Sequence, residues 1–200
     1  KCWGGLDLSS TTDLTTLVLV FPDADGGYDV LSWFWVPGDA IHERAERDRV
    51  PYPLWKRQGH LETMRGRAID KRYIVRRMAE ITSPFDVQSV AYDRWRIEDL
   101  KVLLTEEGID VTLQPWGQGY KDMGTAVDAL ETCVIAHKLR TDNPLMTWCA
   151  LNAVTTRDPA GSRKIAKDRS HERVDGAVGL AMAIGLHKRE PAPKQSVYAG

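Results

Sequence analysis

The chain has 200 residues, of which 42% are hydrophobic and 28% charged, and its formal net charge is −1 at pH 7. This length fits one domain with a single hydrophobic core and is too short for two substantial domains. No apolar run reaches the roughly 20 residues that a membrane-spanning helix needs, so we expect no membrane segment. The near-zero net charge argues against a surface that is positive throughout, and it restricts nucleic-acid binding to local basic patches.

The cysteines and the first residues indicate the setting of the chain. Cys2, Cys133 and Cys149 are odd in number and lack CxxC spacing, which argues against a disulfide framework or a cysteine zinc site and favours a reducing compartment. The first residues lack the apolar stretch of a signal peptide, and an apolar strand begins almost at once without an initiating Met. We therefore expect the sequence to be part of a longer protein.

Three strands are predicted near the start of the chain, at residues 6–9, 15–21 and 28–36, which are rich in β-branched and aromatic side chains. Clusters of turn-forming residues at 10–13 and 23–27 separate them. This spacing predicts a three-stranded antiparallel meander.

After the meander, helical and strand patterns alternate. Residues 39–49 are polar and helical in character, and residues 70–81 have helical periodicity with Asp70 in the N-cap position. The patterns that follow predict a strand at 87–92, a helix at 97–107, a strand at 110–113, helices at 123–139 and 145–154, a loop at 156–170, and a last helix at 171–186. In that last helix, Gly176 and Gly179 would allow a close approach to a sheet.

A meander followed by βαβα units is the element order of the ribonuclease H-like fold, an α/β fold whose mixed sheet is flanked by helices. We predict this fold for residues 1–187. The following residues, 188–200, break the helical pattern with charged residues and prolines, so we expect a disordered tail or linker there. In this fold the end of the strand at 87–92 lies beside the first strand.

Three acidic motifs lie far apart in the sequence, each at the edge of an apolar run, and they centre on Asp7, Asp93 and Asp175. An ionised carboxylate that leaves water is destabilising unless a cation or hydrogen-bond donors compensate. Adjacent strands are about 4.8 Å apart, so the first two acids could share ligands, and a helix crossing the sheet could add the third.

Three converging carboxylates predict a site for Mg²⁺ or Mn²⁺, and two such ions can promote hydrolysis of a phosphodiester. Each acid also has a structural explanation when it is considered alone. Asp7 could be a strand residue at a turn, Asp93 a cap after its strand, and Asp175 a partner of a helix N-terminus.

Four neighbouring residues have roles that the sequence leaves open. Asp13 fits the first hairpin turn, and Glu172 could supply an outer carboxylate on the last helix. His171 could orient a water molecule or a phosphate, or simply lie beside a helix cap. Arg94 could bind a phosphate or pair with Asp93.

The strongest local concentration of positive charge lies at residues 157–173. It is explained either by a solvated loop or by a loop that binds DNA phosphates weakly and without sequence preference. Its six cations, which outnumber three acids, are Arg157, Arg163, Lys164, Lys167, Arg169 and Arg173.

From residue 4 to residue 186 the ordered set of motifs resembles the C-terminal nuclease domain of large terminase subunits from tailed double-stranded DNA phages. The motifs that carry the resemblance are Gly5-Leu6-Asp7-Leu8-Ser9 with Asp13, Gln118-Gly119-Tyr120-Lys121-Asp122-Met123, Asn143-Pro144 with Trp148-Cys149 and Asn152, Arg157-Asp158-Pro159-Ala160-Gly161, Lys164, Lys167, and Glu172-Arg173-Val174-Asp175-Gly176. The resemblance implies that Asp7, Asp93 and Asp175 are the catalytic, metal-binding acids of an endonuclease that cuts phage DNA when packaging starts and ends.

The resemblance also implies the surroundings of such a domain. Mg²⁺ or Mn²⁺ would be the cofactor and double-stranded DNA the substrate. In the full-length protein the partners would be an N-terminal packaging ATPase domain, the small terminase subunit and the portal. The location would be the host cytoplasm, and transiently the procapsid portal.

Two other classes of function fit parts of the sequence. An actin-like phosphotransferase or ATPase lobe is one, because Asp7-Leu8-Ser9-Ser10-Thr11-Thr12 resembles the phosphate-binding hairpin of that fold. That fold, however, needs two lobes to enclose a nucleotide. The other is a non-catalytic DNA-binding clamp with the same fold, and the presence of all three acids counts against it. No GxxxxGK[ST] phosphate loop or GxSxG elbow is present in the sequence.

Overall fold

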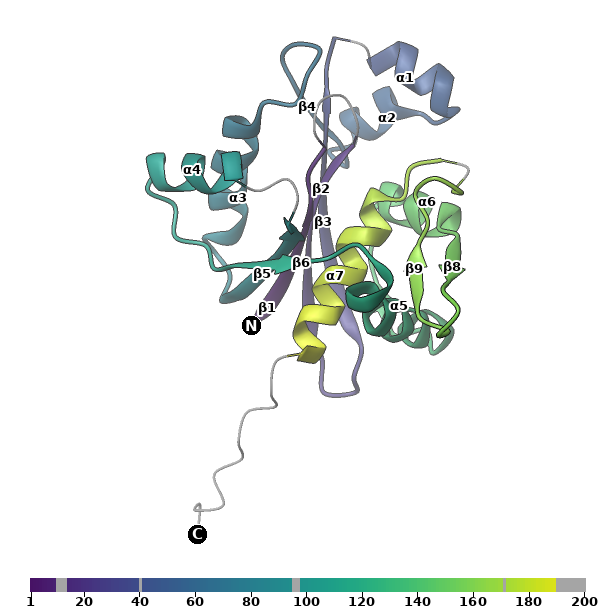
Figure 1. Ribbon diagram of the computed structural model, residues 1–200. Coiled ribbons are helices and arrows are strands. Elements are labelled where there is room, and N and C mark those ends of the chain that lie inside the picture. Colours follow the sequence, from purple (N-terminus) through teal and green to yellow (C-terminus); the bar gives the residue numbers. More distant parts are fainter. Residues whose placement is uncertain (10–13, 40, 95–97, 171, 190–200) are drawn as a thin grey trace.

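The computed structural model describes residues 1–9, 14–39, 41–94, 98–170 and 172–189 (Figure 1). Their centre is a mixed sheet in the order β4-β3-β2-β1-β5-β6, with β7 paired to β3. The strands are β1 (Cys2–Asp7), β2 (Thr15–Pro22), β3 (Tyr28–Pro37), β4 (Glu62–Met64), β5 (Val87–Asp93), β6 (Leu113–Trp116) and β7 (Leu139–Arg140).

The predicted meander is confirmed, although its first strand occupies Cys2–Asp7 and not residues 6–9. β1 and β2 pair antiparallel, as do β2 and β3. The turn between β2 and β3 is held by Asp23, whose carboxylate accepts hydrogen bonds from the backbone amides of Asp25 and Gly27 at 2.9 and 2.7 Å. Gly26 lies between them with a φ of +75°, a left-handed conformation that favours glycine.

Parallel strands extend the sheet on the other side of β1, as the predicted ribonuclease H-like topology requires. β5 pairs with β1 and β6 pairs with β5, both in parallel. The strand predicted at 110–113 is displaced, since β6 occupies Leu113–Trp116. Pro115 argues against a strand at this position in the sequence. An edge strand nevertheless tolerates proline, because the amides on its outer side need no partner in the sheet.

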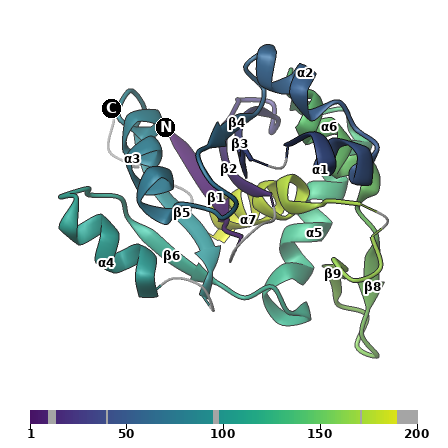
Figure 2. The same ribbon diagram turned by 90° about the horizontal axis from the view of Figure 1, so that it is seen from above.

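Helices cover both faces of the sheet (Figure 2). One face carries α3 and α4, and the other carries α5, α6 and α7, each layer with its own buried apolar cluster. The helices are α1 (Ile41–Asp48), α2 (Tyr52–Arg57), α3 (Lys71–Thr82), α4 (Glu98–Glu106), α5 (Tyr120–Ile135), α6 (Pro144–Asn152) and α7 (Asp175–Arg189). None of the helices in the described part of the chain is long and apolar enough to cross a membrane.

Helix α3 forms as its sequence predicts. Asp70 is its N-cap, and its side chain accepts hydrogen bonds from the amides of Arg72 and Tyr73 at 3.0 and 3.2 Å. Such a cap contributes about 1 kcal/mol to helix stability. Ile74 and Met78, one turn apart, are fully buried and direct the helix onto the sheet.

Helix α7 packs against β1 with no side chain between their backbones. A Cβ atom added to Gly5 would lie 2.0 Å from the Gly179 carbonyl oxygen, so the strand has no room for a larger residue at this point. A Cβ atom added to Gly179 would lie 3.1 Å from a Val18 methyl group, a tight contact. The close approach predicted for this helix is therefore confirmed at Gly179.

The ends of α7 differ from the prediction. It begins at Asp175, four residues after the predicted start, and it includes Lys188 and Arg189, which the sequence predicts to lie in the tail. The last turn is held because the Arg189 guanidinium lies 3.6 Å from the Trp116 ring centre and donates to the Asp122 backbone oxygen at 3.1 Å. The rest of the predicted tail lies outside the described residues.

Other elements were not predicted or were placed differently. The predicted loop at 156–170 contains an antiparallel hairpin of β8 (Thr155–Arg157) and β9 (Arg163–Ile165). The short α2, β4 and β7 were also missed, because elements of six, three and two residues are too short to show periodicity. The helix predicted at 123–139 is α5, which ends at Ile135, so Leu139 lies in β7.

Candidate metal centre

Asp7 is the last residue of β1, and its side chain is only 5% exposed. Side chains alternate along a strand, so Asp7 lies on the same face as Gly5, which contacts α7. The apolar residue between them, Leu6, packs into the cluster on the α3 face. This alternation directs the first predicted acid toward α7.

Asp175 is the first residue of α7, and its side chain is 14% exposed. An acid in the first turn of a helix is favoured by the partial positive charge of the helix N-terminus. Burial, reinforced by the negative charge of Asp7, nevertheless raises the pKa of Asp175 to about 7. These two carboxylates therefore interact, although 168 positions separate them in the sequence.

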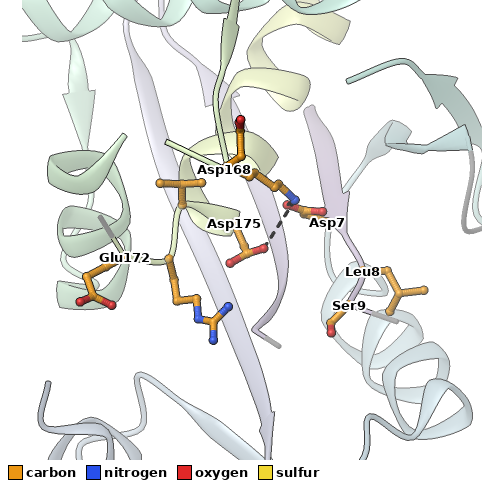
Figure 3. Close-up of a pocket in the computed structure, with 9 residues that line it drawn as sticks. Asp7, Leu8, Ser9, Asp168, Glu172 and Asp175 are labelled. Atoms are coloured by element: carbon orange, nitrogen blue, oxygen red, sulfur yellow. Dashed lines mark hydrogen bonds and ion pairs between the residues drawn. The ribbon is translucent and has the colours of Figure 1, made fainter. Parts of the chain in front are cut away.

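A lysine links the two acids. Lys167 Nζ lies 2.5 Å from Asp7 Oδ2 and 3.6 Å from Asp175 Oδ1. The other oxygen of Asp7, Oδ1, accepts a hydrogen bond from Gln118 Nε2 at 3.3 Å. Figure 3 shows Asp7 and Asp175 facing one another, with a dashed line marking the ion pair to Asp175.

The acid pair lines a cavity of about 360 Å³. Asp168 and Glu172 also line it, but their side chains point away from the pair (Figure 3). The charged residues of its lining are four carboxylates and two cations, the cations being Lys167 and Arg173. The lining is thus negative, and the outer carboxylate predicted at Glu172 borders the cavity without joining the pair.

Asp93 ends β5, the neighbouring strand. The register pairs Leu6 with Tyr92, so Asp7 and Asp93 follow a matched pair at the same end of two parallel strands. Ala91 belongs to the cluster on the α7 face, and alternation places Asp93 on that face as well. Asp93 does not, however, line the cavity that Asp7 and Asp175 share.

The structure assigns a partner to Arg94. Its guanidinium donates to Asp122 Oδ2 at 2.6 Å. Asp122 also accepts from Arg189 at 3.3 Å, so it joins the end of β5 to the end of α7. Asp13 and His171 lie outside the described residues.

The cations of residues 157–173 are less available to bind DNA phosphates than the sequence alone suggests. Arg163 is only 11% exposed and pairs with Asp128 and Glu131 at 2.5 and 2.7 Å. Arg173 Nε lies 3.7 Å from the buried Asp48. With Lys167 at the acid pair, three of the six cations contact acids of the fold.

Two contributors to the site were not recognised as such in the sequence. In the sequence, Lys167 is one of the basic residues at 157–173, and both Lys167 and Gln118 belong to motifs of the resemblance. The sequence does not indicate that both residues contact Asp7, because Lys167 lies 160 positions and Gln118 lies 111 positions away from it.

The donor set suits a hard divalent cation. Mg²⁺ and Mn²⁺ prefer carboxylate oxygens, and the cavity offers two buried carboxylates within a negative lining. Among the described residues, no three His, Cys, Asp or Glu side chains are close enough together to hold a metal ion in this conformation. The pairing of Asp7 and Asp175 is thus a feature of the structure, while the three-acid site with Asp93 stays a prediction.

Known proteins resemble this chain over most of its length. The family model described as "Terminase large subunit, endonuclease domain" matches residues 1–190. The large terminase subunit of Enterobacteria phage HK97 is 42% identical over 191 residues, covering 95% of this chain and 38% of that protein. Protein YmfN of Escherichia coli (strain K12) is 29% identical over 204 residues, covering 94% of this chain and 44% of YmfN. The chain therefore spans less than half the length of these curated relatives.

Solved structures support the fold. The crystal structure of the HK97 large terminase matches with a TM-score of 0.89 at 42% identity, covering 93% of this chain and 39% of that one. The large terminase nuclease from thermophilic phage G20c with bound magnesium matches with a TM-score of 0.58 at 16% identity, covering 92% of this chain and 79% of that one. The mixed α/β architecture is therefore that of terminase nuclease structures, a ribonuclease H-like fold.

Proposed function

This chain belongs to the family of terminase large subunit endonuclease domains, and we propose that it is a metal-dependent endonuclease that cuts double-stranded phage DNA during genome packaging. The observation that carries the proposal is the buried pair of Asp7 and Asp175 at one negative cavity. Two buried carboxylates at one cavity are destabilising unless cations compensate their charge, and a divalent ion could serve both.

Asp7, Asp93 and Asp175 are the residues that would hold Mg²⁺ or Mn²⁺. When bound, divalent ions would supply activation of the attacking water and stabilisation of the leaving oxygen of the phosphodiester. Asp7 and Asp175 would supply ligands from β1 and α7, and Asp93 from the neighbouring strand end. The magnesium named with the G20c nuclease structure supports this choice of ion.

The wider setting is part of the same proposal. In the full-length protein an N-terminal packaging ATPase domain, the small terminase subunit and the portal would be partners, and the protein would act in the host cytoplasm and transiently at the procapsid portal. The family match favours cleavage over the actin-like lobe, and the acid pair favours it over a clamp that only binds DNA.

A plasmid-cleavage assay with Mn²⁺, with Mg²⁺ and with chelator tests the proposal. Asp7→Asn and Asp175→Asn keep the side-chain shape but remove the charge, so each should lower cleavage by about 100-fold or more. Asp168→Asn is the matched control, because this acid borders the same cavity but points away from the pair (Figure 3). Cleavage at the parental rate by both variants of the pair would show that the site assignment is wrong.

Asp93→Asn tests the third acid separately. If Asp93 supplies a ligand, its replacement should lower cleavage as strongly as the other two. If cleavage is lost only with Asp7 and Asp175, the centre consists of the acid pair alone and the strand-end position of Asp93 is structural.

A further inference from the structure

We infer that Lys167 is a positioning residue of the candidate metal centre, where its ammonium occupies the place of a cation between Asp7 and Asp175 and holds them together while no divalent ion is bound. This inference rests on the proposed function. It adds that the centre contains its own exchangeable counter-cation, with which a divalent ion has to compete.

The distances support this role. Lys167 Nζ is 2.5 Å from one carboxylate and 3.6 Å from the other, so a single positive charge serves both acids. Buried like charges repel one another strongly, because little water is present to screen them. An ammonium between them relieves this repulsion, as a bound divalent cation would.

The backbone of Lys167 is fixed independently of the acids. The preceding residue, Ala166, is buried, and its amide donates to the Val154 carbonyl at 2.8 Å. Its own carbonyl accepts hydrogen bonds from the amides of Arg169 and Ser170 at 3.2 and 3.0 Å, and from the Ser170 hydroxyl at 2.8 Å. The turn that presents Lys167 therefore does not depend on its ammonium, and a change of this side chain should leave the turn intact.

The side chain is also placed to withdraw. Lys167 is 40% exposed, whereas the carboxylates that it contacts are 5% and 14% exposed. Its flexible four-carbon stem can carry the ammonium into water without disturbing the fold. The acids cannot follow, because they are attached to β1 and α7, whose backbones are in contact at Gly5 and Gly179.

Mn²⁺ binding by calorimetry provides the test. Lys167→Met removes the charge but keeps the apolar stem, so the competing cation is lost, and the dissociation constant for Mn²⁺ should fall by about tenfold or more. Lys167→Arg keeps the charge and should bind Mn²⁺ no more tightly than the parent. Lys164→Ala is the control, since that lysine lies over the Tyr120 ring, 5.0 Å from its centre, and does not line the cavity.

Thermal melting gives a second readout. In chelator Lys167→Met should melt at a lower temperature than the parent, because the two acids lose their counter-cation. Mn²⁺ should then raise its melting temperature more than that of the parent, since a ligand that binds only the folded state stabilises it by mass action. A lysine that only braces the structure would lower the melting temperature without strengthening Mn²⁺ binding, and that result would overturn the inference.

A third measurement needs no variant. The ¹⁵N resonance of the Lys167 ammonium in the parent should shift when Mg²⁺ saturates the protein, because the ammonium leaves the acid pair. An unchanged resonance at saturation overturns the inference. Failure of both the parent and Lys167→Met to bind Mn²⁺ or Mg²⁺ would overturn the proposed metal centre itself, and the inference with it. Equal affinities of the two proteins would overturn only the role of Lys167.

Discussion

The acids and the lysine of the candidate metal centre are held in the fold by different forces. Asp7 and Asp175 sit on β1 and α7, which touch backbone to backbone and bury apolar side chains around that contact. Packing of this kind depends little on salt. The positions of the two acids should therefore be set by the core and be tolerant of ionic strength.

The segment that carries Lys167 is joined to the rest of the fold in part by charge. Arg163 in β9 pairs with Asp128 and Glu131 on α5, and Arg173 approaches Asp48 on α1. The acids that pair with Arg163 are exposed, so these pairs weaken as salt screens them, whereas Asp48 is buried. We therefore expect the acids on β1 and α7, the acid half of the site, to be held rigidly. The segment that carries Lys167, the cation half, should be held less firmly at high salt.

The largest effect on stability is expected at the backbone contact between Gly5 and Gly179, in the acid half of the site. Gly5→Ala should lower the free energy of unfolding by about 3 kcal/mol or more, because the new methyl group would overlap the Gly179 carbonyl. Gly124→Ala is the control, since the nearest atom to its added Cβ is 3.6 Å away and alanine favours a helix. Urea unfolding measures both variants, and a Gly5→Ala protein as stable as the parent would remove the basis for calling this half rigid.

A smaller effect, with a defined pH dependence, is expected at the acid pair. Burial and the Asp7 charge raise the pKa of Asp175 from 3.8 to about 7, so between these values the folded state retains a proton that the unfolded state has released. The stability that this group contributes therefore falls as pH rises from about 4 to about 7. Asp175→Asn avoids this loss. In chelator at pH 8 it should melt at least about 2–4 °C above the parent, the shift that 1 kcal/mol produces in a domain of this size.

The same comparison at pH 4 provides the internal control for Asp175→Asn. There the parental carboxyl is protonated in the folded protein, and the difference in melting temperature should nearly vanish. A difference that is equal at pH 4 and pH 8 would mean that the variant stabilises the protein for a reason other than charge.

DNA binding should depend more on the exposed cations of residues 157–173 than on those that are paired with acids. Arg157→Ala and Arg169→Ala should each weaken binding to duplex DNA without sequence preference and reduce the salt dependence of log K by about one unit. Arg163→Ala should have less effect, because this guanidinium is already occupied by two carboxylates. Fluorescence anisotropy over a range of salt concentrations measures this, and equal losses for all three variants would contradict the distinction.

The smallest effect is expected for the stability of Arg163→Ala. Its ion-pair partners on α5 are exposed, so the loss should be about 0.2–1 kcal/mol at low salt and should fade at high salt. Urea unfolding at two salt concentrations would show it. A salt-independent loss would indicate that the buried stem of Arg163, and not its charge, attaches the hairpin.

Local signals made much of the fold predictable. Asp70 caps α3 as expected, and the β-branched runs of β2 and β3 form the meander, because caps and alternation act within a few residues. The β8–β9 hairpin was missed because strands of three residues, rich in charge, have no distinguishing period. The sequence of residues 157–173 predicts either a solvated loop or a DNA-binding loop, because the acids that pair with Arg163 and Arg173 lie on other elements.

The candidate site was predictable in its residues more than in its arrangement. The motifs around Asp7 and Asp175 show that each acid borders an apolar run. The predicted topology then indicated that the two acids lie close together in the fold. The position of Lys167 between them could not be predicted, since only the finished sheet and helix packing determine which cation reaches a buried acid. For the same reason the relation of Asp93 to the cavity did not follow from its sequence.

The ion pair between Lys167 and Asp7 also bears on how the chain acquires its structure. Its two residues are 160 positions apart, and closing so long a loop carries a large entropic cost that only cooperative assembly of the sheet offsets. During synthesis the first strand is complete long before α7 emerges, so no partly made chain can assemble the acid pair. Affinity for a divalent cation should therefore arise last, as a sign that the whole domain has folded.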